Sequence, residues 1–339
     1  MRRFLKSLLT GVLVPCALLA GAADAADIQQ RTLRFPYANN KGHPQDLGVQ
    51  KFAEIVAAKS GGKITVKSYP GGQLGPDLPT VSAMQGGTMD MTVMNASLLA
   101  GNVKEMAVFD FPLLFRNGRE VDAVADGAVG RKLLDKLPER GLVGLAYWEL
   151  GFRHFHGSKR PIKTADDMKG LKMRVIPTPI YVDFMNATGA NAVPMPYTET
   201  YTALESRTVD GMGNPLLNIL YGKFYEVNKY LTIANYMHNL QAVIVSKKLW
   251  DKLSEDERTI IRDAANEAAV YQRRVAREED AKVLDQLKAQ GMIVNELPPE
   301  EVAKLGEIAK PVIAKYSKDI GEDLVKDLYA EIEKVRAKP

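Results

Sequence analysis

The most informative stretch of this chain is residues 167–216, which read DMKGLKMRVIPTPIYVDFMNATGANAVPMPYTETYTALESRTVDGMGNPL. Residues 172–176 predict a short apolar strand with Arg174 in its middle. A guanidinium between Met173 and Val175 needs an anion nearby, because an unpaired charge in apolar surroundings is costly. Its planar set of N–H donors matches a carboxylate. The pattern therefore predicts a pocket for an organic acid.

Strands and helices alternate on the N-terminal side of this stretch. Apolar spacing predicts strands at 32–38, 63–69 and 89–94 and helices at 44–59 and about 77–85. Such alternation indicates βαβ units and a mainly parallel sheet. The pattern restarts near Leu142, with further strands around Lys172 and Ala192. We therefore expect a second α/β domain, and the chain is long enough for two.

A long helix is predicted at residues 254–290. Ser254 and Glu257 have the spacing of a capping box, and Gly291 is a suitable terminator. A helix of that length would extend over roughly 54 Å, which exceeds one small domain. Two shorter helices with a bend are the alternative.

The N-terminus resembles a secretory signal. Basic residues precede an apolar run at 8–20, and Ala23-Asp24-Ala25 fits a signal peptidase site. We expect residues 1–25 to be a signal peptide that is cleaved after Ala25, which implies export to the periplasm. A lipoprotein signal that uses Cys16 and an uncleaved anchor are the alternatives.

Composition excludes several function classes for the processed chain. Cys16 is the only cysteine, so cleavage would remove disulfides and cysteine chemistry. Loss of Arg2, Arg3, Lys6 and Asp24 leaves 42 basic and 40 acidic residues, a net charge of +2 that does not indicate nucleic-acid binding. No later apolar run reaches the ~20 residues of a spanning helix.

Several motifs together resemble the periplasmic solute receptors of TRAP transporters, the DctP-like family. They are LRFPYANNKGHP, YPGGQLGPD, KGLKMRVIP, PMPYTETYTALESRTVDGMGNPL, KFYEVNKYL and LSEDERTIIRDAANEAA. The resemblance implies an α/β, two-domain periplasmic binding protein of type II-like fold, with a hinge and one long helix spanning both domains. We expect domain I to comprise 27–150 plus 240–279, and domain II 151–239 plus 280–339.

The resemblance also implies a function. The protein would be a monomeric receptor that binds a small organic acid between its domains and delivers it to the membrane subunits of an ion-driven TRAP permease. No cofactor is implied. A periplasmic enzyme acting on an acid, and a receptor for another importer or a sensor, are the alternatives.

Three site residues carry the strongest expectations from the resemblance. Arg174 would clamp the carboxylate, Arg153 would add a second cation, and Asn214 would contact the acid. The residues alone leave other roles open. Arg174 could pair with a structural acid, Arg153 could stack on aromatic rings, and Asn214 before Pro215 could cap a helix.

Five further residues are weaker ligand-binding candidates. Gln73 and Asn95 follow predicted strands, where ligands collect in open α/β sheets, although turn chemistry is the alternative. Tyr197 and Tyr236 combine an apolar ring with a hydroxyl, and each could instead belong to the core. His43 follows a glycine in a loop that could line the cleft.

No motif indicates catalysis or a metal. His154 and His156 lie on one face of a predicted strand without a third ligand, so we interpret them as structural. No nucleophile elbow, zinc helix, P-loop or dinucleotide fingerprint is present. Two features differ from the sialic-acid type of receptor. Those receptors often carry an acidic residue at the position of Asn95, and many members have DGQENP where this chain has DGMGNP. A hydroxy or sugar acid is therefore our ligand hypothesis.

Overall fold

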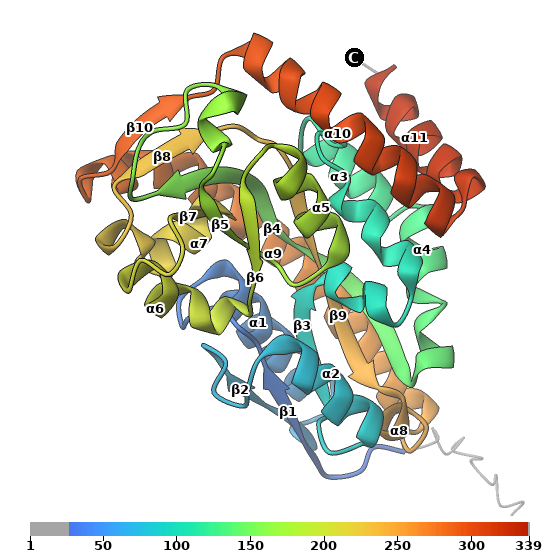
Figure 1. The fold of residues 1–339 in the computed structure, drawn as a ribbon. Helices are drawn as coiled ribbons and strands as arrows, with labels where there is room; N and C mark the ends of the chain where they lie inside the picture. Colours follow the sequence, from blue (N-terminus) through green and yellow to red (C-terminus); the bar gives the residue numbers. More distant parts are fainter. Residues whose placement is uncertain (1–26, 338–339) are drawn as a thin grey trace, which may run out of the picture.

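The computed structural model describes residues 27–337, so the predicted signal peptide and Cys16 lie outside the described residues. The chain forms a mixed α/β structure with helices packed around twisted sheets (Figure 1). Within residues 27–337 no helix is long and apolar enough to cross a membrane. The strands are β1 (Arg31–Pro36), β2 (Ile64–Tyr69), β3 (Met91–Asn95), β4 (Leu142–Gly157), β5 (Lys172–Val175), β6 (Asn191–Pro194), β7 (Gly211–Pro215), β8 (Tyr230–Ile233), β9 (His238–Ser246) and β10 (Ile293–Glu296).

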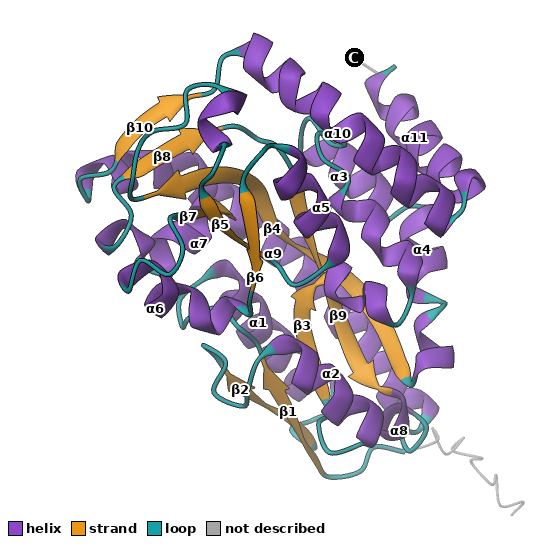
Figure 2. Cartoon of the chain, viewed as in Figure 1, coloured by secondary structure: helices purple, strands orange, loops and turns teal. Residues whose placement is uncertain are grey.

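The strand β4 connects two sheets (Figure 2). Its first part, through Phe152, pairs with β9, which in turn pairs with β3. Its last part, from Arg153 to Gly157, pairs with β7 and β8. Beyond these lie β5 and β6 on one side and β10 on the other, while β1 and β2 form a separate parallel pair.

The expectation of a mainly parallel sheet was wrong. Among the described strands four pairs are parallel, and the other four, β3–β9 and the three pairs made by β4, are antiparallel. The chain passes from the first half of the molecule to the second along β4 and returns along β9. Because these two neighbouring strands carry the chain in opposite directions, their pairing is antiparallel. The alternation of helices and strands in the sequence gives no information about strand direction.

The three predicted helices are present: the helix predicted at 44–59 has those bounds, and those predicted at about 77–85 and 254–290 differ from α2 and α9 by no more than one residue at each end. The helices of the described chain are α1 (Pro44–Lys59), α2 (Asp77–Gly86), α3 (Gly118–Ala125), α4 (Ala128–Leu134), α5 (Pro179–Ala187), α6 (Thr200–Glu205), α7 (Leu216–Tyr221), α8 (Lys247–Trp250), α9 (Glu255–Ala289), α10 (Pro299–Ile320) and α11 (Glu322–Arg336).

The long helix α9 is continuous, so the alternative of two bent helices was wrong. Ser254 caps it, and the capping box with Glu257 is formed in both directions. Its C-terminal cap, Gln290, precedes Gly291, whose φ of 88° suits glycine. The helix packs on α1 and on β4, and farther along it packs on α7, which follows β7. It therefore contacts elements from both predicted domains.

The predicted domain boundaries can be located on the fold. The boundary at 150/151 falls at a bulge in β4, where the register with β9 shifts between Glu149 and Gly151. The boundary at 239/240 falls near the start of β9. The C-terminal helices contact elements of both predicted domains, because α10 packs on α5 and α11 packs on α3. The division into two domains stays a prediction.

Candidate ligand-binding site

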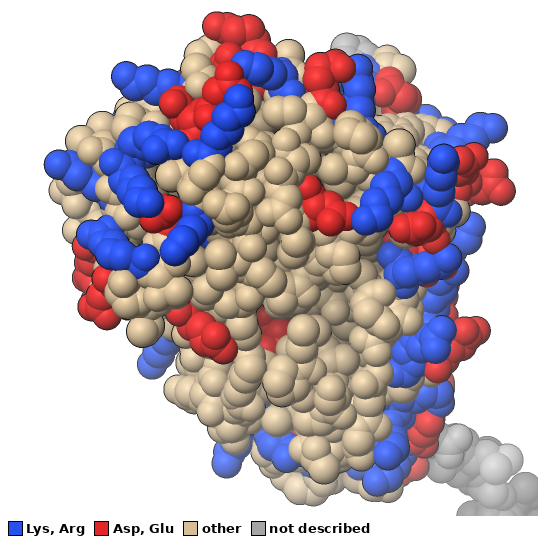
Figure 3. All heavy atoms as spheres, in the orientation of Figure 1, with Lys and Arg blue, Asp and Glu red and all other residues tan. Residues whose placement is uncertain are grey.

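A cavity of about 250 Å³ lies between the two sheets that share β4. On the face of the molecule in Figure 3, charged side chains gather mainly toward the margins and uncharged residues cover most of the middle. The cavity walls come from the ends of β1, β3, β5, β6 and β7 and from β4 and β9. Its polar lining residues are Asn39, Gln45, Asp77, Asn95, Arg153, Arg174, Tyr197, Asn214, Asn218, Asn239 and Gln241.

Arg174 is a buried cation without a carboxylate partner. It lies on β5 and is 2% exposed. Its Nε and Nη2 donate to the carbonyl oxygen of Met195, over 3.1 and 2.8 Å. Within residues 27–337 no Asp or Glu carboxylate lies within ion-pair distance of it, although the charge of Asp77 acts on it from farther away. Burial, assisted by the charge of Arg153, lowers the pKa of Arg174 to about 9.

Arg153 is held by protein groups on every side. It lies on β4, its Nε donates to the Tyr236 hydroxyl over 3.0 Å, and its Nη1 donates to Asn239 Oδ1 over 2.6 Å. Its Nη2 donates to the carbonyl oxygen of Gly213. The guanidinium carbon also lies 5.2 Å from the centre of the Tyr181 ring. Arg153 therefore brings a fixed positive charge to the cavity wall.

Tyr236, which was predicted to bind the ligand, does not line the cavity. It instead accepts a hydrogen bond from Arg153 and so helps to position that lining residue. Its ring stacks on Phe155 with centroids 4.3 Å apart, and its hydroxyl fills the space beside Gly213. A Cβ atom at position 213 would lie 1.8 Å from that hydroxyl oxygen. The glycine in DGMGNP thus makes room for the tyrosine that orients Arg153.

Asn214 lines the cavity from a strand, so the alternative of a helix cap was wrong. It belongs to β7, which continues through Pro215, and Pro215 itself occupies the N-cap position of α7. The Asn214 side-chain nitrogen lies 3.8 Å from Met212 Sδ and makes no hydrogen bond to a protein oxygen or nitrogen in the described chain. Its amide therefore faces the cavity with hydrogen-bonding capacity to spare.

Asn95 and Tyr197 also line the cavity. Asn95 ends β3 and caps a short 3₁₀ helix, because its Oδ1 accepts from Ser97 N over 3.0 Å and from Ser97 Oγ over 2.6 Å. Its Nδ2 is buried and has no hydrogen-bond partner in residues 27–337. Tyr197 follows β6, and its ring packs edge-on against Phe224 at 5.8 Å.

His43 and Gln73 lie outside the cavity wall. His43 caps α1, where its Nδ1 accepts from Gln45 N over 3.0 Å and its Nε2 lies 3.2 Å from Asn218 Oδ1. Burial lowers its pKa to about 4, so the ring is neutral and Nε2 donates to Asn218, which lines the cavity. Gln73 is exposed in the turn after β2, where Gly72 has a φ of 70°.

Six polar lining residues were not predicted: Asn39, Gln45, Asp77, Asn218, Asn239 and Gln241. Five are amides, a residue type that gives no periodic or motif signal. Gln241 interrupts the otherwise apolar run LQAVIVS of β9, which is the one feature that could have drawn attention to it. The others come together only through tertiary contacts.

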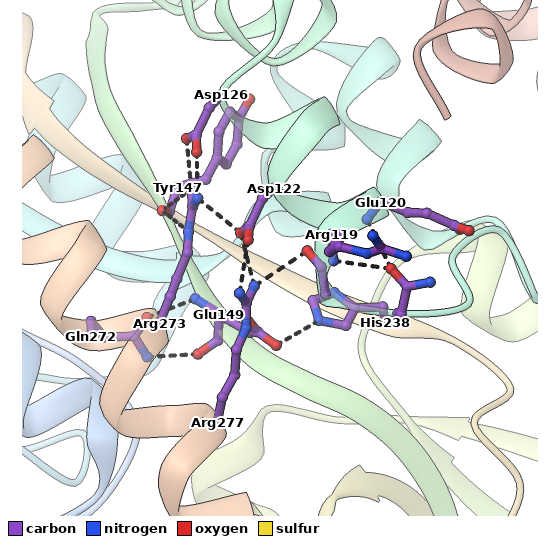
Figure 4. Close-up of polar contacts among 12 residues, drawn as sticks. Arg119, Glu120, Asp122, Asp126, Tyr147, Glu149, His238, Gln272, Arg273 and Arg277 are labelled. Carbon is purple, nitrogen blue, oxygen red and sulfur yellow. Dashed lines mark hydrogen bonds and ion pairs between the residues drawn. The ribbon is translucent and has the colours of Figure 1, made fainter. Parts of the chain in front are cut away.

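A second polar cluster lies at the β4 bulge and is connected by ion pairs and hydrogen bonds (Figure 4). Arg277 of α9 bridges Glu149, at 2.6 Å, and Asp122 of α3, at 2.7 Å. Arg273 also contacts Asp122, at 3.1 Å, and His238 Nε2 lies 3.2 Å from Glu149 Oε1. This cluster connects α9, α3 and the two crossing strands, which indicates a structural role.

The predicted His154–His156 pair has structural contacts. His154 Nδ1 accepts from the backbone nitrogen of Ala234 over 3.2 Å, and His156 Nδ1 lies 2.7 Å from Asn228 Nδ2. Burial lowers the pKa of each ring to about 3. Among residues 27–337 no group of three or more His, Cys, Asp or Glu could hold a metal ion.

Two sheets sharing a strand, with a cavity between them and a buried unpaired arginine in its wall, define a solute-binding protein. Residues 35–319 match the model of the DctP family, described as bacterial extracellular solute-binding protein, family 7, and the chain belongs to this family.

Two relatives of known structure and a named bacterial relative agree with this assignment. A TRAP periplasmic solute-binding protein from Ochrobactrum anthropi, with its C-terminus bound in its ligand-binding pocket, is 51% identical, with a TM-score of 0.82 over 92% of this chain and 98% of that one. The sugar acid binding protein DctPAm from Advenella mimigardefordensis, in complex with galactonate, is 39% identical, with a TM-score of 0.89 over 91% and 99%. The 2,3-diketo-L-gulonate-binding periplasmic protein YiaO of Escherichia coli is 32% identical over 91% of this chain and 95% of its own length.

Proposed function

We propose that this protein is a periplasmic receptor that binds a small organic acid in the cavity between its sheets and passes it to a TRAP permease. The observation that carries the proposal is the buried guanidinium of Arg174, which has no carboxylate within ion-pair distance in residues 27–337. A ligand carboxylate would supply the missing charge. The fixed charge of Arg153 and the free amide of Asn214 would support the same end of the ligand.

The delivery step and the location rest on family membership. Two of the relatives described above are periplasmic binding proteins by name; one of these is named for 2,3-diketo-L-gulonate, and a third relative, a sugar acid binding protein, is in complex with galactonate. We infer export by a signal peptide at residues 1–25, closure of two domains on the acid, and docking of the closed monomer on the membrane subunits of the permease. Closure would be favoured by the acid only if the acid binds the closed form more tightly.

One feature of the cavity makes an enzyme worth testing as the second candidate. Asp77 lines the cavity at the start of α2, and burial raises its pKa to about 6 although Arg174 opposes the shift. A carboxyl group with such a pKa could act as a general base. A nucleophile oriented by that base is missing from the described cavity lining, and the relatives are binding proteins, so we favour the receptor.

A thermal-shift screen against a library of carboxylic acids tests the proposal. An acid present at 100 times its Kd should add about 2.7 kcal/mol to the free energy of unfolding. The amide of each acid serves as its control, because it has the same shape without the charge. Stabilisation by acids and amides alike, or by neither, would contradict the proposal. Conversion of a bound acid on prolonged incubation would favour the enzyme instead.

A further inference from the structure

One edge of the second sheet lies away from the ligand cavity. The strands β5, β6, β7, β8 and β10 run parallel to one another in this sheet, and β4 runs antiparallel to β7 and β8. The starts of these five strands and the end of β4 therefore share one edge, where Ile293, Tyr230, Gly157 and Gly211 are successive partners. The cavity is lined from the opposite ends of β5, β6 and β7. We call residues 157–172, 205–211, 226–230 and 290–293 the distal edge.

The distal edge carries the net positive charge of the processed chain, residues 26–339. It contains seven basic and five acidic residues, whereas the rest of that chain contains 35 of each. Figure 3 shows basic side chains gathered over the region that β8 and β10 occupy in Figure 1. All seven basic residues are exposed, and they are Lys159, Arg160, Lys163, Lys169, Lys172, Arg207 and Lys229.

Five of these seven cations have no acidic partner. Lys159 lies 2.9 Å from Asp210, and Lys169 lies 2.9 Å from Asp166. The other five basic residues of the distal edge form no ion pair within residues 27–337. Their charge is therefore available to a negatively charged partner outside the chain.

An exposed isoleucine lies among these cations. Ile293 begins β10 and is 47% exposed, and in the described chain only four large hydrophobic residues are exposed. Its backbone nitrogen donates to the carbonyl oxygen of Lys229 over 2.8 Å, so it lies beside one of the unpaired basic residues. Basic side chains attract a protein to an anionic bilayer, and an apolar side chain among them can enter the headgroup region. The distal edge combines both features.

We propose that the distal edge binds the anionic lipid headgroups of a membrane surface, with Ile293 entering the headgroup region. The proposal goes beyond the proposed function, because lipid binding requires neither an acid nor a permease. A protein partner would bury a packed core of apolar side chains, and the distal edge exposes one large hydrophobic residue. Because the edge and the cavity lie at opposite ends of β5, β6 and β7, lipid and acid do not compete.

The test measures co-sedimentation of the processed chain with lipid vesicles. The anionic vesicles contain equal parts of phosphatidylglycerol and phosphatidylcholine, and the neutral vesicles contain phosphatidylcholine alone. The edge variant replaces Lys163, Lys172 and Lys229 by glutamine, which removes three unpaired charges. The matched control replaces three exposed lysines outside the edge by glutamine and so has the same net charge; they are Lys67 on β2, Lys132 on α4 and Lys326 on α11. Ile293→Thr removes apolar surface and keeps a β-branched residue at the start of β10.

The unchanged protein should bind anionic vesicles and not neutral ones at about 0.01 M ionic strength, and should be released at about 1 M, where the Debye length is roughly 3 Å. Each basic residue near an anionic surface strengthens binding about fivefold, so the edge variant should bind roughly a hundredfold more weakly. The control should lose less than about threefold. Ile293→Thr should lose roughly three- to tenfold with an unchanged dependence on salt. Thermal unfolding confirms that each variant is folded.

Three outcomes would overturn the inference. The unchanged protein could fail to bind anionic vesicles, or the edge variant and the control could lose binding equally, which would make the attraction a matter of net charge alone. Binding could also be confined to native membrane vesicles and abolished by protease treatment of those vesicles, which would make the partner a protein. None of these outcomes touches the proposed function, because the edge variant should bind organic acids with unchanged affinity.

Discussion

The guanidinium of Arg174 donates two hydrogen bonds to one backbone acceptor, the carbonyl oxygen of Met195, at 3.1 and 2.8 Å. Both donors, Nε and Nη2, are thereby held by the segment that follows β6. The third nitrogen, Nη1, makes no hydrogen bond in residues 27–337. A neutral carbonyl fixes the position of the cation without neutralising it, so the positive charge stays available to a ligand.

Replacement of Arg174 by lysine should weaken the binding of the acid by roughly ten- to a hundredfold, because a charge-assisted hydrogen bond contributes about 1.5–3 kcal/mol. An ammonium cannot bond Met195 and a carboxylate with the geometry of a planar guanidinium. Arg174→Ala should lose more, and both variants should fold. Calorimetric titration measures the affinities. Unchanged affinity in Arg174→Lys would remove the carboxylate clamp, and an unfolded ligand-free variant would make Arg174 structural.

A methyl group at Gly213 should disturb the site through Tyr236. Gly213→Ala places a Cβ against the tyrosine hydroxyl that orients Arg153, so we expect at least tenfold weaker acid binding and a loss of about 1–3 kcal/mol of stability. The destabilisation should be smaller in a Tyr236→Phe background, where the hydroxyl is absent. Urea unfolding of the unchanged protein, the two single variants and the double variant measures the coupling free energy between positions 213 and 236. Additive changes in the free energy of unfolding would refute the contact between the added methyl group and the tyrosine hydroxyl.

Two helical glycines should respond oppositely to alanine. Gly48 lies where α1 crosses α9, and a Cβ there would come within 2.8 Å of Gln272 Cγ and Trp148 Cζ3. Gly48→Ala should cost about 1–3 kcal/mol. A Cβ at Gly86, in the last turn of α2, meets no atom within 4 Å, so Gly86→Ala should be neutral or gain up to about 1 kcal/mol. Urea denaturation measures both, and equal effects would contradict the packing account.

The buried imidazole of His43 should destabilise the fold as the solution becomes acidic. Burial lowers its pKa to about 4 from 6.5, so between these values the unfolded chain binds a proton that the folded chain does not. Stability from this group is present above pH 6.5 and is lost as pH falls toward 4. From pH 7 to pH 5 the loss should be about 2 kcal/mol, at about 1.4 kcal/mol for each pKa unit.

The contribution of His43 is isolated by comparison with His43→Asn, since asparagine also caps helices and does not titrate. The free energy of unfolding of the unchanged protein, minus that of the variant, should fall by about 2 kcal/mol between pH 7 and pH 5. Chemical denaturation at both pH values gives this difference. A difference that stays constant would mean that His43 has the same pKa in the folded and the unfolded protein.

Ionisation of Asp77 should weaken the binding of an acid. Burial raises the pKa of Asp77 to about 6, so its negative charge develops in the cavity as pH rises through that value. The affinity for a carboxylate should therefore fall between pH 5 and pH 7, and binding at pH 6 should take up a proton. Asp77→Asn should make the affinity independent of pH in this window. Titration in buffers of different ionisation enthalpy detects the proton, and its absence would place Asp77 away from the bound acid.

The elements whose signals are local were predictable from the sequence. The capping box at Ser254 and Glu257 and the terminator Gly291 gave the bounds of α9 almost to the residue, because a helix end is decided by groups within one turn of it. The spacing of apolar residues likewise predicted α1. The burial of Arg174 was predictable from its two apolar neighbours, whereas its role toward the ligand came from the family resemblance and stays a prediction.

What the tertiary structure decided is which distant residues meet. The antiparallel course of β4 and β9 follows from the chain crossing twice between two halves, and no local propensity encodes it. Tyr236 supports Arg153 and His43 supports Asn218 because strands and helices far apart in sequence pack together. The pairing of Asn95 with Gln241 joins positions 146 residues apart. A polar side chain reveals its role only when its partner, or the lack of one, is known, and that depends on the packing of the whole chain.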